Sequence, residues 1–313
     1  MNTVYTDTGQ RVKKTLGKRI WEYRYFYLLL LPALIFYVLF AYVPMAGIQL
    51  AFKHFSILKG IWGSQWTGLE NFKAVFSRAD FWVAFKNTVI ISALKLCFGF
   101  PIPILIAILF NELRSRKLRR TLQTIYTFPH FLSWVTLAGI IMNFLGDQGF
   151  VNNVLAALGM RRSEFMVNPQ MFRGLLVFSD IWKESGWTCI MYLAAMAGID
   201  PSLYESATID GANRWNKIVA ITWPGIRELA AILLILAVGN AMNVSFDQVF
   251  NLYSPPVYSS ADIIDTYVYR ITFKMTPDYG FSTAVGLFKG VINCALLMIA
   301  NGIQKRLSDS SVF

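Results

Sequence analysis

The composition of the chain excludes most soluble classes of protein. It has 313 residues, of which 55% are hydrophobic and 15% are charged. Soluble globular proteins carry about 25% charged residues, so this class is excluded, together with disordered and disulfide-rich chains. Lysine and arginine outnumber aspartate and glutamate by 29 to 18, which gives a net charge of +11. In so apolar a chain this excess indicates loops that orient a membrane protein, not a surface for nucleic acid.

Six apolar stretches are long enough to cross a bilayer, which takes about 20 residues per helix. They are Phe26–Phe52, Thr88–Phe110, Ile125–Leu145, Phe172–Gly198, Leu229–Phe250 and Phe281–Ile303. The first stretch is too long for a cleaved signal segment, so we expect it to remain as a helix. The sequence therefore predicts an all-α membrane protein with one transmembrane domain at 26–303, a basic tail at 1–25 and a short tail at 304–313.

The positions of the cations predict the orientation. The segment Arg114–Arg120 carries five cations and no acid, as cytoplasmic loops do. With the N-terminus inside, sixteen cations fall in inner segments and ten in longer outer segments, if Arg173 at the edge of the fourth stretch is counted as outer. We therefore expect both termini in the cytoplasm. Aromatic residues between 62 and 82 predict an outer interfacial segment with a short helix along the membrane.

The loop at 199–226, between the fourth and fifth stretches, is longer than most helix connections. Asp200 followed by Pro201 is typical of a helix start, and Asp210-Gly211 is typical of a break. We expect one short helix up to Ile209 and a second short helix, capped by Asp210, from the next residues onward.

The second helix is expected to start at Ala212 and to end before Pro224 opens the fifth span. Trp215, Ile218, Val219 and Thr222 would then share one face. Two short helices at right angles to the bundle would expose an apolar elbow, and such an exposed surface implies a protein partner.

Three short motifs in this loop resemble the EAA loop of binding-protein-dependent ABC transporter permeases. They are Glu205-Ser206-Ala207, Asp210-Gly211-Ala212 and Ile221-Thr222-Trp223-Pro224. The segments 182–195 and 262–270 are also similar to the LplB-like branch of polysaccharide and oligosaccharide permeases. Ser206 stands where the family usually has alanine, and Trp223 where it usually has leucine.

The resemblance implies a type I ABC importer permease fold, of the MalF/MalG kind, in a bacterial plasma membrane. It also implies a second homologous permease, two ATP-binding cassette ATPase subunits and an extracytoplasmic solute-binding protein, which would dock on outer loops such as 252–278. The residues expected to contact the ATPase are Glu205, Ser206, Ala207, Asp210, Gly211, Ala212, Trp215 and Ile218. Membrane lipid would surround the chain, and no nucleic acid is expected.

The sequence predicts no catalytic, metal or cofactor site in this chain. It lacks the Gly-x-x-x-x-Gly-Lys-Ser/Thr phosphate loop, so ATP and Mg would be bound by the partner ATPase subunits. Its two histidines, His54 and His130, are far apart, and its three cysteines lie singly in apolar stretches. We therefore expect a pore-forming subunit and not an enzyme.

Polar side chains within the spans mark the expected substrate path, because such groups normally face a bundle interior or water. The candidates are Asn240, Asn243, Trp182, Glu184 and Lys289. Asn240 and Asn243 would form one helical stripe with Asp247, while Asp180 and Lys183 are expected to be structural. Amides and carboxylates suit sugar hydroxyls, and aromatic rings suit sugar faces. Hydrogen bonds that only join helices remain the alternative.

The leading hypothesis is an importer subunit that moves an oligosaccharide or polysaccharide fragment by alternating access. The cations Arg270, Lys274 and Lys289 would suit a glycan that bears uronates; the alternative is that Arg270 and Lys274 lie outside and dock the solute-binding protein. The alternative is an ion-coupled secondary transporter of small polar solutes, in which Asp180, Glu184 or Asp247 would be the coupling carboxylate. A membrane-embedded enzyme ranks third, because no catalytic constellation is visible.

Overall fold

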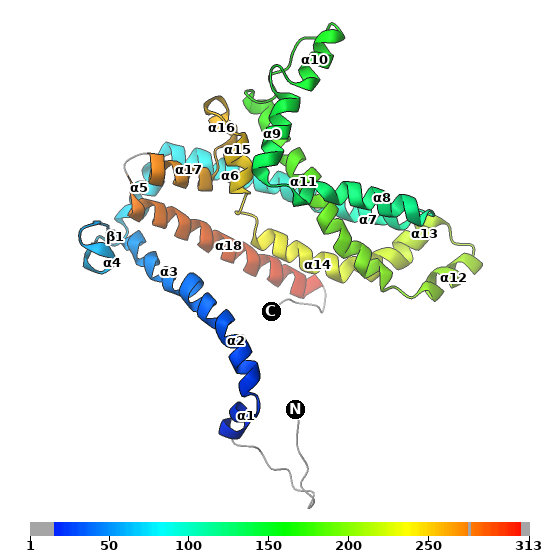
Figure 1. Cartoon of the computed structure of the whole chain (residues 1–313), viewed down its shortest axis with the longest axis horizontal. Helices are drawn as coiled ribbons and strands as arrows, with labels where there is room; N and C mark the ends of the chain where they lie inside the picture. Colours follow the sequence, from blue (N-terminus) through cyan, green and yellow to red (C-terminus); the bar gives the residue numbers. More distant parts are fainter. Residues whose placement is uncertain (1–15, 275–276, 308–313) are drawn as a thin grey trace, which may run out of the picture.

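The structure is a computed structural model that describes residues 16–274 and 277–307. It is helical almost throughout and includes a two-stranded antiparallel sheet of β1 (Lys53–His54) and β2 (Gln65–Trp66). Figure 1 shows a long bundle from which α1–α2 and α9–α10 project in different directions. Most of the predicted N-terminal tail, and residues 308–313 of the C-terminal tail, lie outside the described residues.

The helices follow one another with short connections. Their bounds are α1 (Leu16–Glu22), α2 (Arg24–Tyr37), α3 (Val43–Met45), α4 (Gly60–Gly63), α5 (Glu70–Ser77), α6 (Ala79–Gly99), α7 (Pro101–Asn111), α8 (Arg116–Thr127), α9 (Trp134–Leu145), α10 (Phe150–Ala157), α11 (Pro169–Ala197), α12 (Pro201–Ile209), α13 (Arg214–Lys217), α14 (Trp223–Gly239), α15 (Phe246–Leu252), α16 (Tyr258–Ala261), α17 (Ile264–Tyr269) and α18 (Tyr279–Leu307). The 3₁₀ or π segments are η1 (Val38–Tyr42), η2 (Ala46–Phe52), η3 (Phe128–Phe131), η4 (Ile218–Thr222), η5 (Pro255–Val257) and η6 (Arg270–Lys274).

Four helical stretches in the described residues are long and apolar enough to cross a membrane, or five if one bent pair is a single span. The four are Arg24–Phe52, Ala79–Asn111, Arg214–Gly239 and Tyr279–Ile303. They contain the first, second and sixth predicted spans, and part of the fifth. Helix α11 has 29 residues but carries charges in its middle. The count of six spans therefore stays a prediction.

The prediction of a single helix over 125–145 is wrong, although the bent pair of helices can still form one span. Helices α8 and α9 meet at an angle of 105°. Pro129 lies in the connecting segment η3, and a proline removes a backbone donor that a continuing helix needs. Ser133 then restarts the chain as the N-cap of α9, where its hydroxyl accepts the backbone N–H of Thr136 at 3.2 Å.

The prediction of a helix over 229–250 is also wrong, because α14 ends at Gly239 and residues 240–245 form a non-helical link before α15. A Cβ atom at Gly239 would lie 2.4 Å from Cδ1 of Leu297, so the glycine permits a close approach of α14 to α18. Asn240, Asn243 and Asp247 therefore do not form one helical stripe.

Three clusters of buried residues hold the bundle together. The first joins α6, α9 and α11 to the segment 244–263, with Phe172 at its centre. The second packs η2, α5, α6 and α17 against α18 around Phe81, and the third packs α7 against α11 and α14 around Tyr192. Helices α6 and α11 each contribute to two of the three clusters, so these two helices link the parts of the bundle.

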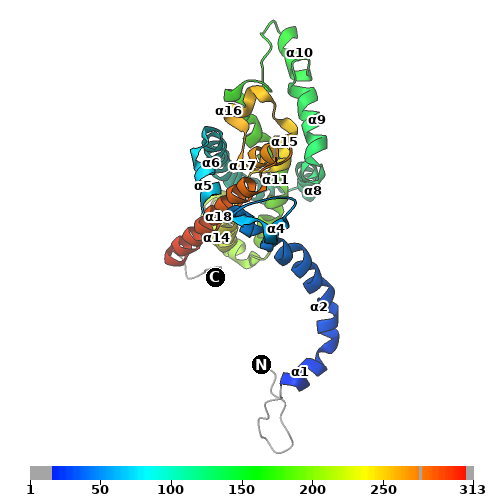
Figure 2. The ribbon, with the colours of Figure 1, turned by 90° about the vertical axis from the view of Figure 1, so that its left-hand side faces the viewer.

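The stretch Arg24–Phe52 stands apart from this bundle. None of the residues in its most apolar 18-residue part is buried against the rest of the chain. Figures 1 and 2 show α2 lying away from the other helices, so that the stretch meets the bundle only at its end, near β1. Its apolar side chains therefore depend on lipid or on another subunit for cover.

Candidate functional site

The elbow at 199–226 begins as the sequence predicts. Helix α12 starts at Pro201, and the Asp200 carboxylate accepts the backbone N–H of Ser202 at 2.9 Å. This hydrogen bond lowers the pKa of Asp200, so the cap stays ionised. The helix ends at Ile209, and Gly211 then takes a φ of +78°, which glycine adopts without steric cost.

The second helix of the elbow differs from the prediction. It begins at Arg214, and its N-cap is Asn213 instead of Asp210; the Asn213 side chain accepts the N–H of Asn216 at 2.8 Å. It is not a separate short helix either, because it runs through η4 into α14 as one helical stretch, Arg214–Gly239. The second arm of the elbow is therefore continuous with the helix that follows it.

Short hydrogen bonds fix the shape of the elbow. The N–H of Ala212 donates to the carbonyl of Ala207 at 2.9 Å. Lys217 Nζ donates to Thr208 Oγ1 at 2.7 Å, and the hydroxyls of Tyr204 and Thr222 lie 3.0 Å apart. These contacts join both arms of the elbow and brace its shape.

The tip of the elbow is apolar and exposed in this chain. Ile209 is 86% exposed and Trp215 is 69% exposed. Of the predicted ATPase contacts, Glu205, Ser206, Asp210 and Gly211 are exposed, whereas Ala207, Ala212 and Ile218 are half-buried. The Ser206 hydroxyl donates back to its own helix, at the carbonyl of Ser202. The elbow thus offers an apolar tip flanked by carboxylates.

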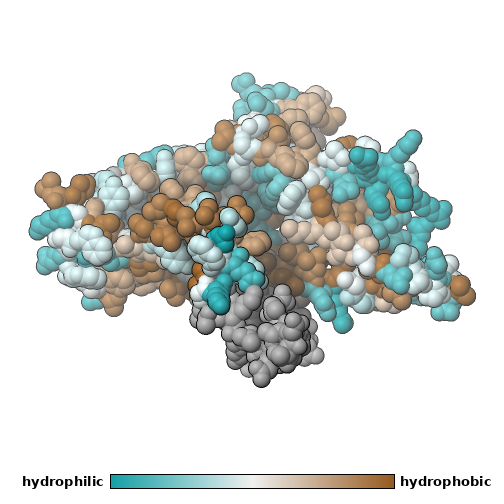
Figure 3. Space-filling view, turned by 60° about the horizontal axis from the view of Figure 1, so that its bottom comes forward, coloured by the Kyte–Doolittle hydropathy of each residue, from teal (hydrophilic) through white to brown (hydrophobic). Residues whose placement is uncertain are grey.

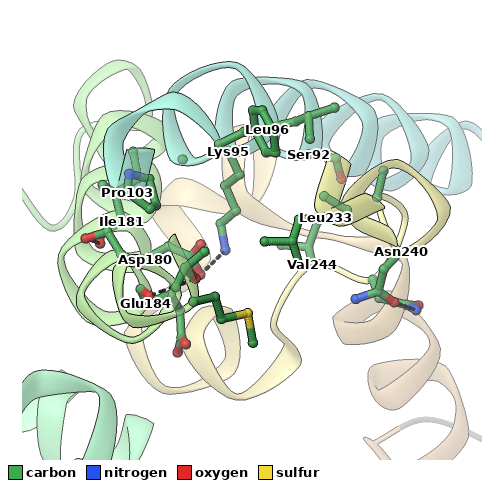
Figure 4. Close-up of a pocket in the computed structure, with 18 of the residues that line it drawn as sticks. Ser92, Lys95, Leu96, Pro103, Asp180, Ile181, Glu184, Leu233, Asn240 and Val244 are labelled. Carbon is green, nitrogen blue, oxygen red and sulfur yellow. Dashed lines mark hydrogen bonds and ion pairs between the residues drawn. The ribbon is translucent and has the colours of Figure 1, made fainter. Parts of the chain in front are cut away.

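A cavity of about 390 Å³ lies between α6–α7, α11 and the end of α14. Figure 4 shows Lys95, Asp180, Glu184 and Asn240 around it. Asn243 also lines the cavity, and its amide donates to the Asn240 side chain. Three of the five predicted substrate-path residues, Asn240, Asn243 and Glu184, therefore meet at one place, although the two asparagines lie at the end of α14 and in the link that follows it.

Lys95 is the cation of this cavity, and the sequence prediction did not include it among the site residues. Its Nζ lies 2.7 Å from Asp180 Oδ1 and 2.6 Å from Gln248 Oε1. Gln248 in turn donates to the carbonyl of Leu176 at 2.7 Å. This cluster joins α6, α11 and α15, which agrees with the expectation that Asp180 is structural. The sequence feature that could have identified Lys95 is a lone lysine in an apolar helix.

Glu184 and Lys183 both bind His130 at the bend between α8 and α9. Glu184 Oε2 lies 2.8 Å from His130 Nδ1, and Lys183 Nζ donates to the His130 carbonyl at 2.6 Å. The His130 ring stacks on Trp187 with ring centroids 4.7 Å apart. The Glu184 side chain is still 42% exposed, so it keeps an open side towards the cavity.

Two predicted substrate-path residues lie elsewhere. Trp182 is half-buried against the first core cluster and does not line the cavity. Lys289 forms an ion pair with Asp265, with Nζ–O distances of 2.7 and 2.8 Å, and is also absent from the cavity lining. The structure therefore places neither residue in this cavity, because packing and an ion pair hold them elsewhere; their role on a path shared with a second permease stays a prediction.

Two hydroxyl groups of the cavity lining have no hydrogen-bond partner among the described residues. They are Ser92 Oγ and Tyr192 OH, and both residues are buried. A buried polar atom without a partner is costly, so these atoms call for water or a polar ligand. Together with the asparagine pair, they give the cavity a partly polar lining.

The chain matches the family described as "Binding-protein-dependent transport system inner membrane component" over residues 99–309. It belongs to this family. The permease is 38% identical to "Polygalacturonan/rhamnogalacturonan transport system permease protein YteP" of Bacillus subtilis (strain 168), over 96% of this chain and 94% of the relative. It is 39% identical to "Protein LplB" of the same organism, over 93% and 91%.

Solved structures give the same fold. A chain of "Crystal structure of bacterial alginate ABC transporter in complex with alginate pentasaccharide-bound periplasmic protein" matches the permease with a TM-score of 0.88 and 39% identity, over 96% of this chain and 100% of that chain. The fold is therefore that of type I ABC permeases. The permease is a multi-pass inner-membrane subunit of an ABC transporter for carbohydrate, as its sequence resemblance implied.

Proposed function

We propose that this permease pairs with a second, homologous permease and moves an acidic oligosaccharide or polysaccharide fragment into the cell by alternating access. Two ATPase subunits would bind ATP and Mg and drive the cycle, and this chain would hold no cofactor of its own. The observation that carries the proposal is the exposed, internally braced elbow, which continues without a break into the helix that ends at the polar cavity.

The coupling step rests on the chemistry of the elbow tip. Trp215 and Ile209 offer apolar area that is costly to leave in water, and desolvated aromatic anchors supply most of the energy of an interface. The exposed Glu205 offers a carboxylate to a cation on the ATPase. Nucleotide-driven closure of the ATPase pair would then push on Arg214–Gly239 and change the cavity at its far end.

The substrate class rests on relatives and on the cavity. YteP is named for polygalacturonan and rhamnogalacturonan, and the solved neighbour for alginate, all of which are acidic polysaccharides. In this chain Lys95 pairs with Asp180, and a second carboxylate, Glu184, also lines the cavity, so the cavity carries no surplus of cations. We therefore infer that this half binds sugar hydroxyls, and that the second permease supplies the cations for the uronate groups.

The second permease and the solute-binding protein fit two further surfaces. The uncovered apolar helix Arg24–Phe52 suits a membrane partner. The projecting α9–α10 segment and the segment 252–278 suit a docking protein on the outer side, and the crystal structure of the relative is a complex with a periplasmic protein.

Co-purification tests the elbow. The permease is expressed with the ATPase and second permease from its own operon, with Trp215→Ala as the test variant and Trp62→Ala as the control. Trp62 is 81% exposed but lies on α4, far along the chain from the elbow. We expect Trp215→Ala to lose most of the bound ATPase, and Trp62→Ala to retain it.

Transport in vesicles tests the energy source. Uptake of a labelled oligogalacturonate should require ATP and the solute-binding protein, and a pH gradient should not replace them. Uptake with a pH gradient alone, or full ATPase binding by Trp215→Ala, would contradict the proposed function and favour an ion-coupled transporter.

A further inference from the structure

A second cavity, of about 620 Å³, lies beside the elbow and shares no lining residue with the substrate cavity. Arg116 and Arg119 of α8 form its cationic side, and Tyr204 of α12 forms part of the opposite side. Leu193 and Met196, from the end of α11, add apolar surface. The cavity thus combines cations with apolar surface.

Helix α8 has three distinct faces. Arg116, Arg119 and Gln123 line the cavity, at the spacing of three and four residues that places side chains on one face. Lys117 and Arg120 lie on the next face. Leu118, Leu122 and Ile125 form an exposed apolar stripe on the opposite side, with Ile125 64% exposed. Such a helix lies at the boundary between water and hydrocarbon.

The cations of this region have no acidic partners. Within residues 16–274 and 277–307, no ion pair involves Arg114, Arg116, Lys117, Arg119 or Arg120. Lys95, Arg270 and Lys289, by contrast, are each paired with an aspartate. One carboxylate, Glu112, lines the cavity, which leaves its two arginines in excess. Figure 3 shows hydrophilic residues gathered at the right-hand end of the molecule, where Figure 1 places the α7–α8 turn and α12.

We propose that this cavity binds the headgroup of an anionic phospholipid of the inner leaflet. Arg116 and Arg119 would hold the phosphate, because guanidinium groups match phosphate with paired hydrogen bonds. Leu193 and Met196 would contact the glycerol and the first acyl carbons, an apolar surface that a free phosphate would leave unused. Basic pockets between helices on the cytoplasmic side suit such headgroups.

The lipid would act on coupling through the elbow. Pro201 and Tyr204 of α12 line the same cavity, so a bound headgroup would lie between α8 and α12, the first helix of the elbow. Tyr204 also contacts Thr222, where the second arm of the elbow continues into α14. Occupancy would therefore hold the elbow in place against the bundle and favour productive contact with the ATPase. This inference rests on the predicted orientation and not on the identity of the substrate.

Native mass spectrometry of the complete, delipidated transporter tests the site. Phosphatidylglycerol is titrated into the wild type, Arg116→Gln/Arg119→Gln and Lys117→Gln/Arg120→Gln. The control pair removes the same charge from the same helix but does not line the cavity. We expect the test pair to weaken phosphatidylglycerol binding about tenfold or more and the control pair less than about threefold, because the second loses only diffuse attraction. Phosphatidylcholine should bind all three alike.

ATPase activity in nanodiscs tests whether the bound lipid affects the function of the transporter. Phosphatidylglycerol should stimulate the wild type and the control pair over phosphatidylcholine, and should not stimulate the test pair. Equal losses in both pairs would overturn the proposal, as would displacement of phosphatidylglycerol by millimolar inorganic phosphate. Release of the ATPase by the test pair would instead show a protein contact and would also overturn it. If the double variant does not assemble, Arg119→Gln alone carries the same comparison.

Discussion

Lys95 shows how a single side chain joins three helical elements. Its Nζ contacts Asp180 of α11 and Gln248 of α15 from its own position on α6. The side chains of Lys95 and Asp180 are 13% and 22% exposed, so the pair is largely removed from solvent. Losing one partner of such a pair leaves a poorly solvated charge, whereas losing both does not.

We therefore expect Lys95→Met to destabilise the purified transporter by about 2 kcal/mol, less than the 3–5 kcal/mol of a fully buried pair because the cavity admits water. The double variant Lys95→Met/Asp180→Leu should regain most of this loss. Thermal unfolding of the wild type, both single variants and the double variant gives the coupling energy. Strictly additive losses would show that the two residues do not act as a pair.

Gly211 is a second residue whose role is conformational. Its φ is +78°, and a Cβ atom there would meet nothing within 4 Å, so the backbone conformation and not lack of space demands glycine. We expect Gly211→Val to strain the elbow by about 1–2 kcal/mol and to lower transport-coupled ATPase activity, because β-branched residues resist this conformation.

Gly211→Asn is the matched control, because asparagine tolerates the left-handed conformation. It should retain most of the coupled ATPase activity, measured as the stimulation by solute-binding protein and substrate. If asparagine and valine reduce coupling equally, contact of the ATPase with the glycine itself, and not the turn conformation, would be the cause.

At the scale of elements, the sequence predicted the position of most helices and missed where they break. Asp200-Pro201 located the start of α12 correctly, because a cap and a proline in the first turn are local signals. The breaks at Phe128–Phe131 and at 240–245 depend on packing that a hydropathy window does not record. Gly239 ends α14 where it approaches Leu297 of α18, a contact between residues far apart in the chain.

The same limit applied to the candidate site. Polarity at helix positions identified Asn240, Asn243 and Glu184, which line the cavity. It also selected Trp182 and Lys289, which face a core cluster and Asp265. A polar residue in an apolar helix must find a partner, but the sequence does not say whether that partner is a cavity or another helix.

A π-helical turn precedes Pro224 at the junction of the elbow and α14. The backbone N–H of Trp223 donates to the carbonyl of Ile218, five residues earlier. Pro224 has no N–H to donate, so the chain accommodates it with the wider turn. The stretch Arg24–Phe52 repeats this arrangement, where the N–H of Val43 donates to Val38 just before Pro44. In both places a proline determines how far one helical segment is rotated about the helix axis relative to the next.

We expect Pro224→Ala to let the π turn revert to an α turn, which would rotate the elbow about α14. Stability should stay within about 1 kcal/mol or increase, because an interior proline is unfavourable in a helix. Coupled ATPase activity should fall clearly, since the tip would face a new direction. Thermal unfolding and ATPase assays on the same preparation separate the two effects. Unchanged coupled ATPase activity would show that the rotation of the elbow about α14 is not important for coupling.

At the scale of the whole molecule, the bundle leaves one long apolar helix without cover. Arg24–Phe52 buries none of its most apolar window against its own chain, and Figure 2 shows α2 curving away from the other helices. Lipid alone would cover such a helix equally well in any position. A definite course away from the bundle is better explained by a second permease that packs against it.

A photo-crosslinking amino acid at Phe40 tests this assignment, because Phe40 is 68% exposed near the middle of the stretch. Illumination of the assembled transporter should join this chain to the second permease, since a packed helix keeps the probe within reach of one neighbour. The control carries the same probe at Trp62, which is exposed on α4 outside the stretch and should give little of this product. Mass spectrometry of the crosslinked peptides identifies the partner. Products with lipid alone, or crosslinks within the chain, would show that α2 does not pack against a second permease.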